Sequence, residues 1–243
     1  MTRTLLKLNP DRDALFLDID GTLLDIAQTP NGVIVPNELK SSLKELYEKL
    51  NGALAIISGR TIEDIDNLFK PLKLPVAGVH GAEWRIGSKA KKEQACFSLP
   101  ENMHQTICNI FKEYNLIKIE DKAYTIAVHY RQAPHLEKMI GEILRSLIVR
   151  TGENIELLQG KMVFEIMRPE FNKAFALEQF MKRAPFAGRK AIYLGDDKTD
   201  IPAINKCQEH QGIGMLVAKG NYFSSPTDVR KWLKEQAWNK LAS

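Results

Sequence analysis

The chain has 243 residues, enough to bury the core of one large domain or of two unequal ones. Its formal net charge of +4 is mild, and without a block of Lys and Arg it argues against nucleic acid and fits a small anionic substrate. No apolar run approaches the roughly 20 residues of a membrane helix, residues 1–13 are too polar for a signal peptide, and the three cysteines form no Cys-x-x-Cys pair. We therefore expect a cytoplasmic protein without a membrane partner, and a monomer rather than an oligomer.

The stretch 14–24 reads ALFLDIDGTLL and is the most informative part of the sequence. Residues 14–17 form a short apolar run, typical of a strand that a parallel sheet buries on both faces. The run stops at Asp18, Asp20 follows two residues later, and Gly21 allows the backbone to turn sharply and to approach a ligand closely. Two carboxylates at the carboxyl end of a buried strand lie where open α/β sheets bind their ligands. By itself, the pattern also fits two solvated aspartates before a turn.

The rest of the chain predicts parallel strands alternating with covering helices. Before residue 99 the expected elements are a helix at 36–50, a strand at 53–57, a helix at 61–69, strands at 74–79 and 82–86, and a possible short strand at 94–98. After residue 168 they are a helix beginning at Lys173, strands at 190–194 and 212–217, and a closing helix at 225–240. The expected fold class is α/β, a Rossmann-like core whose parallel sheet is flanked by helices.

The segment between these two halves has a different pattern. Apolar residues at helical spacing predict two helices, and each is followed by two short strands, at 116–120 and 123–131 and then at 154–158 and 161–167. Two helix–strand–strand units make a compact α+β domain. We therefore expect an inserted domain at 99–168 within a core formed by 1–98 and 169–243.

Two strands of the inserted domain alternate strictly between apolar and polar residues. This period of two places Ile126, Val128 and Tyr130, and likewise Met162, Phe164 and Ile166, on a buried face. The opposite face then carries His129, Arg131, Lys161 and Glu165. Such a face is either a binding surface or the solvated side that most antiparallel sheets have.

Polar side chains also follow the other predicted core strands. Ser58, Gly59 and Arg60 follow the second strand, and Asp196, Asp197 and Asp200 follow the strand at 190–194. Because parallel strands share a carboxyl edge, these groups are expected to meet Asp18 and Asp20 there, near Lys173. Oxygen ligands without His or Cys favour Mg²⁺, and the Ser58 hydroxyl and Lys173 ammonium suit a phosphoryl group. Taken singly, Ser58 fits a helix cap, and His80, after the third strand, fits a structural histidine.

This arrangement predicts phosphoryl transfer. Asp18 can act as nucleophile and form an aspartyl-phosphate, while Asp20 can protonate the leaving oxygen and later take a proton from water. A magnesium ion would neutralise charge that otherwise keeps a carboxylate away from a phosphate dianion.

The order Asp-x-Asp-Gly-Thr, Ser, Lys, Gly-Asp-Asp-x-x-Asp resembles that of the haloacid dehalogenase (HAD) superfamily of phosphatases. An insert between the Ser and the Lys corresponds to the larger cap type of that superfamily. The likeness narrows to the trehalose-6-phosphate phosphatase family, and the residues that carry it are 57–60, 77–83, 129–134, 159–161 with 165–166, and 195–200. Two positions depart from the family pattern, namely Ala174 after the motif lysine and Ile201 after the acidic motif.

The resemblance implies a role for each matching residue. Asp18, Asp20, Ser58 and Lys173 would be catalytic. Magnesium would be held by Asp18, by the backbone carbonyl of Asp20 and by Asp196, with Asp197 or Asp200 acting through water. The expected substrate-binding residues are Gly21, Thr22, Arg60, His80, Gly81, Arg131, Lys161 and Glu165, the last three meeting the glucose hydroxyls from the cap.

The sequence leaves several functions open besides Mg²⁺-dependent hydrolysis of trehalose 6-phosphate. A phosphatase for another sugar phosphate, such as sucrose phosphate or a hexose phosphate, shares all core motifs. A phospho-acceptor signalling domain also combines acidic residues with a Ser or Thr and a Lys, although the inserted domain favours turnover. A catalytically inactive sugar-phosphate sensor would have lost Asp18 or Asp20, and both are present.

Overall fold

The computed structural model describes residues 6–26, 33–95 and 98–238, and the statements below concern these residues. The chain divides into two compact units. The core unit consists of residues 1–93 and 172–243, and the inserted unit consists of residues 94–171. The possible strand at 94–98 and the end of the predicted closing helix fall partly on residues 96–97 and 239–240, which lie outside the described residues.

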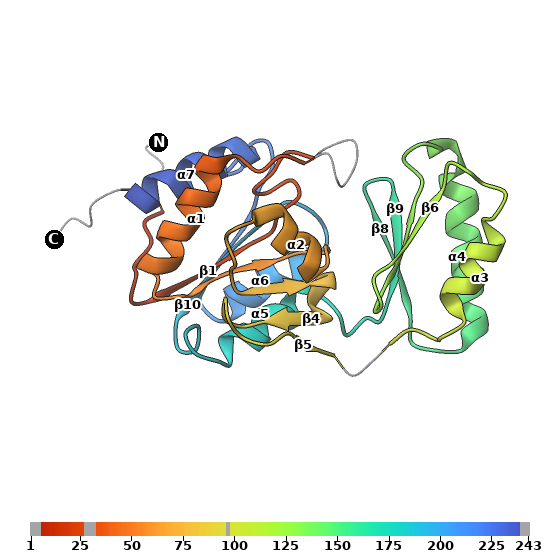
Figure 1. The fold of residues 1–243 in the computed structure, drawn as a ribbon, viewed down its shortest axis with the longest axis horizontal. Coiled ribbons are helices and arrows are strands. Elements are labelled where there is room, and N and C mark those ends of the chain that lie inside the picture. The colour runs from red at the N-terminus through yellow and green to blue at the C-terminus, as the bar shows by residue number, and fades with distance from the viewer. Residues whose placement is uncertain (1–5, 27–32, 96–97, 239–243) are drawn as a thin grey trace. The chain divides into compact units, whose positions relative to one another are not determined.

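The core unit is built on a seven-stranded sheet in the order β11-β10-β1-β2-β3-β4-β5. Figure 1 labels β1, β10, β4 and β5 of this sheet. Neighbouring strands from β11 to β3 run parallel, whereas β4 pairs with β3 in the antiparallel sense. The strands are β1 (Asp13–Leu17), β2 (Leu54–Ile57), β3 (Val76–Gly78), β4 (Glu83–Arg85), β5 (Glu93–Gln94), β10 (Lys190–Gly195) and β11 (Ile213–Leu216).

Strand β1 lies between β10 and β2, and all five of its residues are buried. Leu17, its last residue, is opposite Leu194 of β10 and Ile56 of β2. The three strands therefore end side by side, and the residues that follow them meet at one edge of the sheet.

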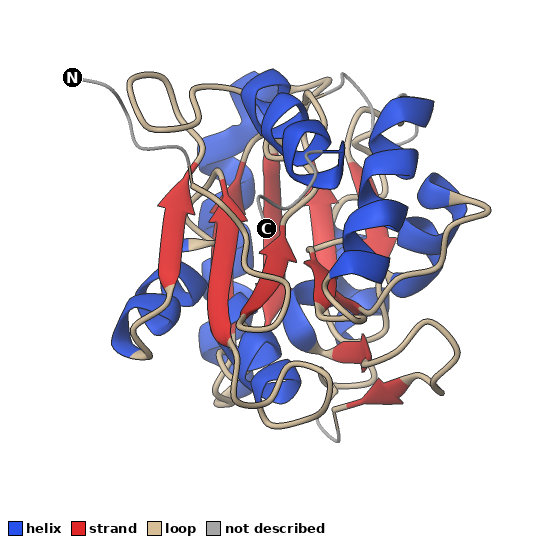
Figure 2. Cartoon of the chain, turned by 90° about the vertical axis from the view of Figure 1, so that its left-hand side faces the viewer, coloured by secondary structure: helices blue, strands red, loops and turns tan. Residues whose placement is uncertain are grey.

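Helices lie on both sides of this sheet (Figure 2). Helix α1 (Asn37–Lys49) packs beside α7 (Pro226–Trp238), α5 (Lys173–Met181) packs beside α6 (Ile201–Glu209), and α2 (Ile62–Phe69) contacts β3. Phe16 of β1 packs against Phe180 and Phe186, with ring centroids 5.8 Å and 5.4 Å away. This aromatic cluster anchors the central strand. The predicted α/β fold class is confirmed.

The inserted unit has a four-stranded antiparallel sheet in the order β6-β7-β9-β8. Its elements are α3 (Met103–Ile110), β6 (Lys118–Asp121), β7 (Ile126–His129), α4 (Glu137–Thr151), β8 (Glu156–Gly160) and β9 (Val163–Met167). One face of the sheet supplies Val128, Tyr130 and Phe164 to a buried cluster that also contains Ile107 and Leu144 of the two helices.

Three details of this unit differ from the predicted pattern. Met162 is 40% exposed because it lies in the turn between β8 and β9, with a left-handed φ of 64°. Leu116 is 51% exposed, since β6 begins only at Lys118. Glu165, which its alternation places on the face opposite the buried one, is only 8% exposed. Among the helices that the structure describes, none is long and apolar enough to span a bilayer.

Candidate active site

The edge where β1 and β10 end holds the buried carboxylate of Asp18, which is 4% exposed. The backbone N–H of Asp18 donates to the carbonyl of Leu194 at 3.0 Å, so the residue continues the alignment of the two strands. Gly21 then turns the chain with a φ of 93°. A Cβ at Gly21 would lie 2.1 Å from Oδ2 of Asp196, so only glycine lets this loop approach the acidic cluster.

Lys173 lies opposite Asp18, and it is also buried. It begins α5, where the side chain of Asn172 caps the helix by accepting from the backbone N–H of Phe175. The Lys173 ammonium donates to Oδ1 of Asp18 at 2.8 Å and to Oδ1 of Asp200 at 2.7 Å. Burial alone lowers the pKa of Lys173, but these two carboxylates outweigh it and raise the pKa above its ordinary value. Lys173 is therefore a fixed positive charge at the sheet edge.

The pKa of Asp18 is raised well above its ordinary value, chiefly by burial. The nearby Lys173 lowers it, while Asp200 and Asp196 raise it further. A cation at this position would favour the ionised form.

Asp200 has no exposed surface, and its two oxygens accept four hydrogen bonds. Oδ1 accepts from Lys173 and, at 2.6 Å, from the hydroxyl of Tyr193; Oδ2 accepts from the backbone N–H groups of Asp196 and Asp197 at 3.1 Å. Asp200 therefore fixes both the lysine and the turn that follows β10. Burial, and then the charge of Asp200, raise the pKa of Tyr193, so the phenol stays a donor.

The donor set suits a divalent cation. Carboxylate oxygens of Asp18, Asp196 and Asp200 all lie within 4.8 Å of one another, and oxygen-only ligands are those that Mg²⁺ prefers. The carboxylates of Asp197 and Asp20 have other partners. Oδ1 of Asp197 accepts from the backbone N–H and the hydroxyl of Thr199, at 2.8 Å and 2.6 Å. Burial tends to raise the pKa of Asp197, but Lys173 and these hydrogen bonds lower it overall.

Asp20 forms a two-pronged ion pair with Arg60. Nε of Arg60 donates to Oδ2 of Asp20 at 2.6 Å, and a terminal nitrogen donates to Oδ1 at 2.7 Å. Burial alone lowers the pKa of Arg60, but the contact with Asp20 raises it overall. Ser58 is 2% exposed, and its Oγ accepts from the backbone N–H of Arg60 at 3.2 Å, which leaves the hydroxyl proton for another acceptor.

Two further residues, Thr22 and His80, lie near the ends of β1 and β2. Thr22 is completely buried, and its hydroxyl has no hydrogen-bond partner among the described residues. Because buried hydroxyls are rarely left without a partner, this one is a candidate donor for a ligand. His80 is 7% exposed and its backbone N–H donates to the carbonyl of Ser58 at 3.1 Å. Gly81 follows with a φ of 101°.

In the inserted unit, the residues predicted to bind substrate lie on or near β7 and β9. Oε1 of Glu165 accepts from the hydroxyl of Thr125 at 2.7 Å and from the ammonium of Lys122 at 3.1 Å. This explains why Glu165 is more buried than its alternation predicts. Arg131 donates to the carbonyl of Lys161 at 3.4 Å, so these two residues lie together.

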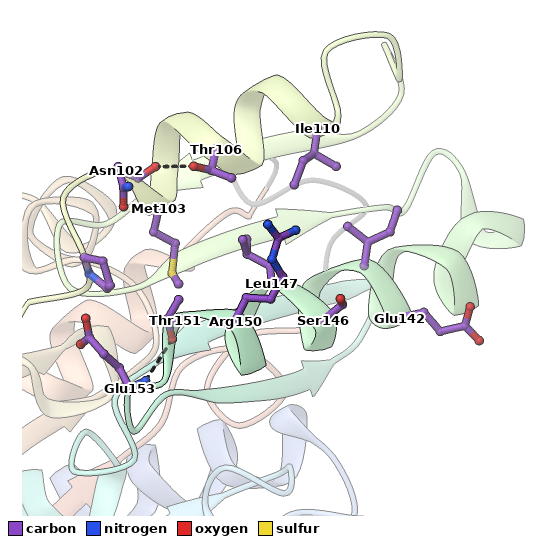
Figure 3. A pocket seen from close by; sticks show the side chains of 12 residues that line it. Asn102, Met103, Thr106, Ile110, Glu142, Ser146, Leu147, Arg150, Thr151 and Glu153 are labelled. Carbon is purple, nitrogen blue, oxygen red and sulfur yellow. Dashed lines mark hydrogen bonds between the residues drawn. The ribbon is translucent and has the colours of Figure 1, made fainter.

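An open groove of about 820 Å³ lies elsewhere in the inserted unit. Figure 3 shows Met103, Thr106 and Ile110 facing Leu147, Ser146 and Arg150 across it. None of the predicted catalytic, metal-binding or substrate-binding residues lines this groove.

Comparison with known proteins identifies the family. The sequence model described as trehalose-phosphatase matches residues 16–236. A probable trehalose-phosphate phosphatase of Sinorhizobium fredii (strain NBRC 101917 / NGR234) is 42% identical over 190 residues, which are 78% of this chain and 72% of the relative. The trehalose-6-phosphate phosphatase of Escherichia coli (strain K12) is 35% identical over 227 residues, which are 91% of this chain and 85% of the relative. The chain belongs to the trehalose-phosphatase family.

The fold of this trehalose-phosphatase family member agrees with solved structures. The C-terminal domain of the C. albicans trehalose-6-phosphate phosphatase superposes with a TM-score of 0.76 at 20% sequence identity, over 98% of this chain and 99% of that one. The fold is also shared with BT1666 from Bacteroides thetaiotaomicron, described as a phosphatase of the haloalkanoate (HAD) enzyme superfamily, at a TM-score of 0.57 and 14% sequence identity, over 97% of this chain and 98% of that one. The predicted family and the predicted enzyme class, a phosphatase, are confirmed; the individual site residues stay predictions.

Two residues of the hydrogen-bond networks described above, Tyr193 beside Asp200 and Thr125 beside Glu165, were not predicted from the sequence. Tyr193 is part of an apolar strand, and the only indication of its role is that a buried tyrosine hydroxyl needs a partner. Thr125 similarly looked like one polar residue of an alternating strand. Its contact with Glu165 crosses from β7 to β9 and depends on strand register.

Proposed function

We propose that the protein is a Mg²⁺-dependent phosphatase that hydrolyses trehalose 6-phosphate to trehalose and phosphate through an aspartyl-phosphate. The single observation that carries the chemistry is the buried carboxylate of Asp18, held 2.8 Å from the Lys173 ammonium at the end of the central strand. The substrate is inferred from the relatives, whose names specify trehalose phosphate.

In the first step, an oxygen of Asp18 attacks the phosphorus atom and the bond from phosphorus to the sugar oxygen breaks. Lys173 and the hydroxyls of Thr22 and Ser58 donate to the phosphoryl oxygens, where charge accumulates. Asp20 enters this step as the neutral carboxylic acid, protonates the departing sugar oxygen and becomes the carboxylate that pairs with Arg60. Gly21 has no side chain, so the backbone can approach the phosphoryl group closely.

In the second step, a water molecule attacks the phosphorus of the aspartyl-phosphate and transfers a proton to Asp20. The bond between phosphorus and the Asp18 oxygen then breaks, which releases phosphate and restores both carboxyl groups. Lys173 remains charged throughout, since two buried carboxylates raise its pKa.

Asp18, the backbone carbonyl of Asp20 and Asp196 would hold Mg²⁺, with Asp197 or Asp200 acting through water. The four hydrogen bonds accepted by Asp200 favour an indirect role for that residue. When bound, the cation neutralises charge between the attacking carboxylate and the phosphate dianion.

Recognition of the sugar is assigned to the inserted unit, which acts as a specificity cap. Arg131, Lys161 and Glu165 of this unit bind glucose hydroxyls. His80 and Gly81 of the core unit are proposed separately as substrate-binding residues. The ion pair between Glu165 and Lys122 supports this, because charged groups form strong hydrogen bonds with hydroxyl groups. The cytoplasmic location and the monomeric state stay predictions from the sequence.

The test is phosphate release from a panel of sugar phosphates, measured with Mg²⁺ and with a chelator. We expect trehalose 6-phosphate to be turned over with the highest kcat/KM, and chelation to remove activity. Similar rates on sucrose phosphate or hexose phosphates would overturn trehalose 6-phosphate as the specific substrate but would not contradict the proposed chemistry. Undiminished activity with the chelator would overturn the metal requirement.

A further inference from the structure

The ion pair between Asp20 and Arg60 joins two loops that are far apart in the sequence. Its two hydrogen bonds, 2.6 Å and 2.7 Å long, fix the plane of the carboxylate, which a single point contact would leave free to rotate. The Asp20 side chain is 38% exposed and that of Arg60 only 16%. The carboxylate therefore remains open to a ligand on one side, while its partner is held against the protein.

The backbone of Arg60 is itself fixed at both of its polar groups. Its N–H donates to Oγ of Ser58 at 3.2 Å, and its carbonyl accepts from the N–H of Val79 at 2.9 Å. Gly78 provides the necessary space, because a Cβ at that position would lie 2.8 Å from the Arg60 carbonyl oxygen. The backbone of Arg60 is therefore held in place by its neighbours, which limits the positions that the guanidinium can take.

These neighbours include a strained turn, η2 (Val79–Gly81), which follows β3. Val79 and His80 have left-handed φ values of 49° and 53°, which cost energy, particularly for a β-branched residue. The His80 ring packs on Gly59, where a Cβ would lie 2.6 Å from its Nε2. The strained turn therefore packs against the loop that carries Arg60 and restricts its movement.

We propose that Arg60 is a positioning residue for Asp20, setting the direction from which Asp20 delivers its proton. The inference rests on the proposed function, in which Asp20 is the acid of the first step. In that step the bond from an Asp18 oxygen to phosphorus forms and the bond to the sugar oxygen breaks. The released electron pair stays on the sugar oxygen, which takes the Asp20 proton. An error of about 1 Å in placing such a group can cost about 100-fold in rate.

The test compares leaving groups. An alkyl phosphate releases a strongly basic oxygen that needs a proton, whereas p-nitrophenyl phosphate releases a stable anion that does not. We use kcat/KM because it reports the steps through formation of the aspartyl-phosphate. Arg60→Gln should lower kcat/KM for an alkyl phosphate that the wild type hydrolyses by about 10–100-fold more than for p-nitrophenyl phosphate.

Arg85 provides a matched control. It forms an equivalent two-pronged pair with Asp66, at 2.8 Å and 2.7 Å, within the same unit. Arg85→Gln should change kcat/KM for both substrates by the same factor, because any effect acts through stability alone. If Arg60→Gln also lowers both equally, the inference is overturned.

A double-mutant cycle distinguishes this inference from failure of the proposed function. Asp20→Asn should show the same leaving-group selectivity, and adding Arg60→Gln should lower kcat/KM for the alkyl phosphate little further. A full additional loss in the double variant means that Arg60 acts on the substrate and overturns the inference. If Asp20→Asn shows no leaving-group selectivity, the acid role in the proposed function is wrong.

Discussion

Buried charges at the end of β1 are tolerated because each has a defined partner. Lys173 contacts Asp18 and Asp200, and Asp200 contacts Tyr193, so the charge of the lysine is compensated twice. A buried charge left without a partner is costly, and the Tyr193 hydroxyl is therefore part of the hydrogen-bond network of the site.

Tyr193→Phe tests this role. Removing the hydroxyl leaves buried Asp200 with one donor fewer, which should lower the free energy of unfolding by about 1–3 kcal/mol. Because Asp200 also holds Lys173, kcat should fall with little change in KM. Denaturant unfolding and steady-state kinetics measure both. Tyr47→Phe is the control, since the Tyr47 hydroxyl contacts only Ser88 at 3.4 Å among the hydrogen bonds described; equal effects of the two substitutions would contradict the role.

Single residues also show what the sequence could predict. Asp18 and Ser58 were predicted as site residues because each follows a strand that ends at the same sheet edge, and Lys173 because it begins a helix near that edge. The pairing of Asp20 with Arg60 was not predicted, since it joins positions 40 residues apart through side-chain geometry that spacing does not encode. Both residues were assigned roles without their mutual contact.

Among the elements, the short β3 and the turn after it leave little room for a larger side chain. Gly78 ends β3, and a Cβ there would lie 2.8 Å from the Arg60 carbonyl oxygen and 2.9 Å from Oε1 of Glu83. That Glu83 oxygen accepts from the backbone N–H of Ile62, the first residue of α2, at 2.6 Å, so Glu83 also stabilises the start of this helix.

Gly78→Ala should therefore destabilise the protein by about 1–3 kcal/mol through overpacking. It should also lower kcat, because the carbonyl of Arg60 must move. Thermal unfolding and kinetics are the measurements. Gly87→Ala is the matched control, since its Cβ would meet nothing closer than 3.7 Å. A Gly78 variant as stable and active as the Gly87 variant would show that this loop adapts freely.

A second prediction at this scale concerns substrate specificity and the strands β7 and β9. Glu165→Gln weakens the contact with Lys122 while keeping a side chain of the same size. Hydrogen bonds to charged groups contribute about 1.5–3 kcal/mol, so kcat/KM for trehalose 6-phosphate should fall by about 10–100-fold.

Turnover of p-nitrophenyl phosphate by the Glu165 variant should change much less, because it has no sugar to recognise. Glu156→Gln, at an exposed position of β8, is the control in the same unit. Equal losses on both substrates would place the sugar site elsewhere.

The elements themselves were largely predictable, but their ends were not. Buried strands and amphipathic helices have clear periods, whereas Leu116 and Met162 were assigned to strands although both are exposed in loops. Apolar character alone does not distinguish a strand residue from an exposed loop residue, and a left-handed φ at a methionine has no sequence signal.

At the scale of the whole molecule, metal binding should increase the stability of the folded state, because only the folded protein brings the carboxylates together. Mg²⁺ should raise the thermal midpoint of the wild type by several degrees. Asp196→Asn should remove most of that shift, while Asp25→Asn, an exposed carboxylate paired with Arg230, should retain it. A wild-type midpoint unaffected by saturating Mg²⁺ would argue against the proposed metal site.

The proposed chemistry depends most on Asp18 as the nucleophile. The direct measurement is mass spectrometry of peptides from enzyme quenched in acid during turnover of trehalose 6-phosphate. We expect the peptide that contains Asp18 to gain the mass of one phosphoryl group, and Asp18→Asn to show neither this gain nor turnover. A phosphoryl group found on another residue, or an Asp18→Asn variant that still hydrolyses the substrate, would show that Asp18 is not the nucleophile.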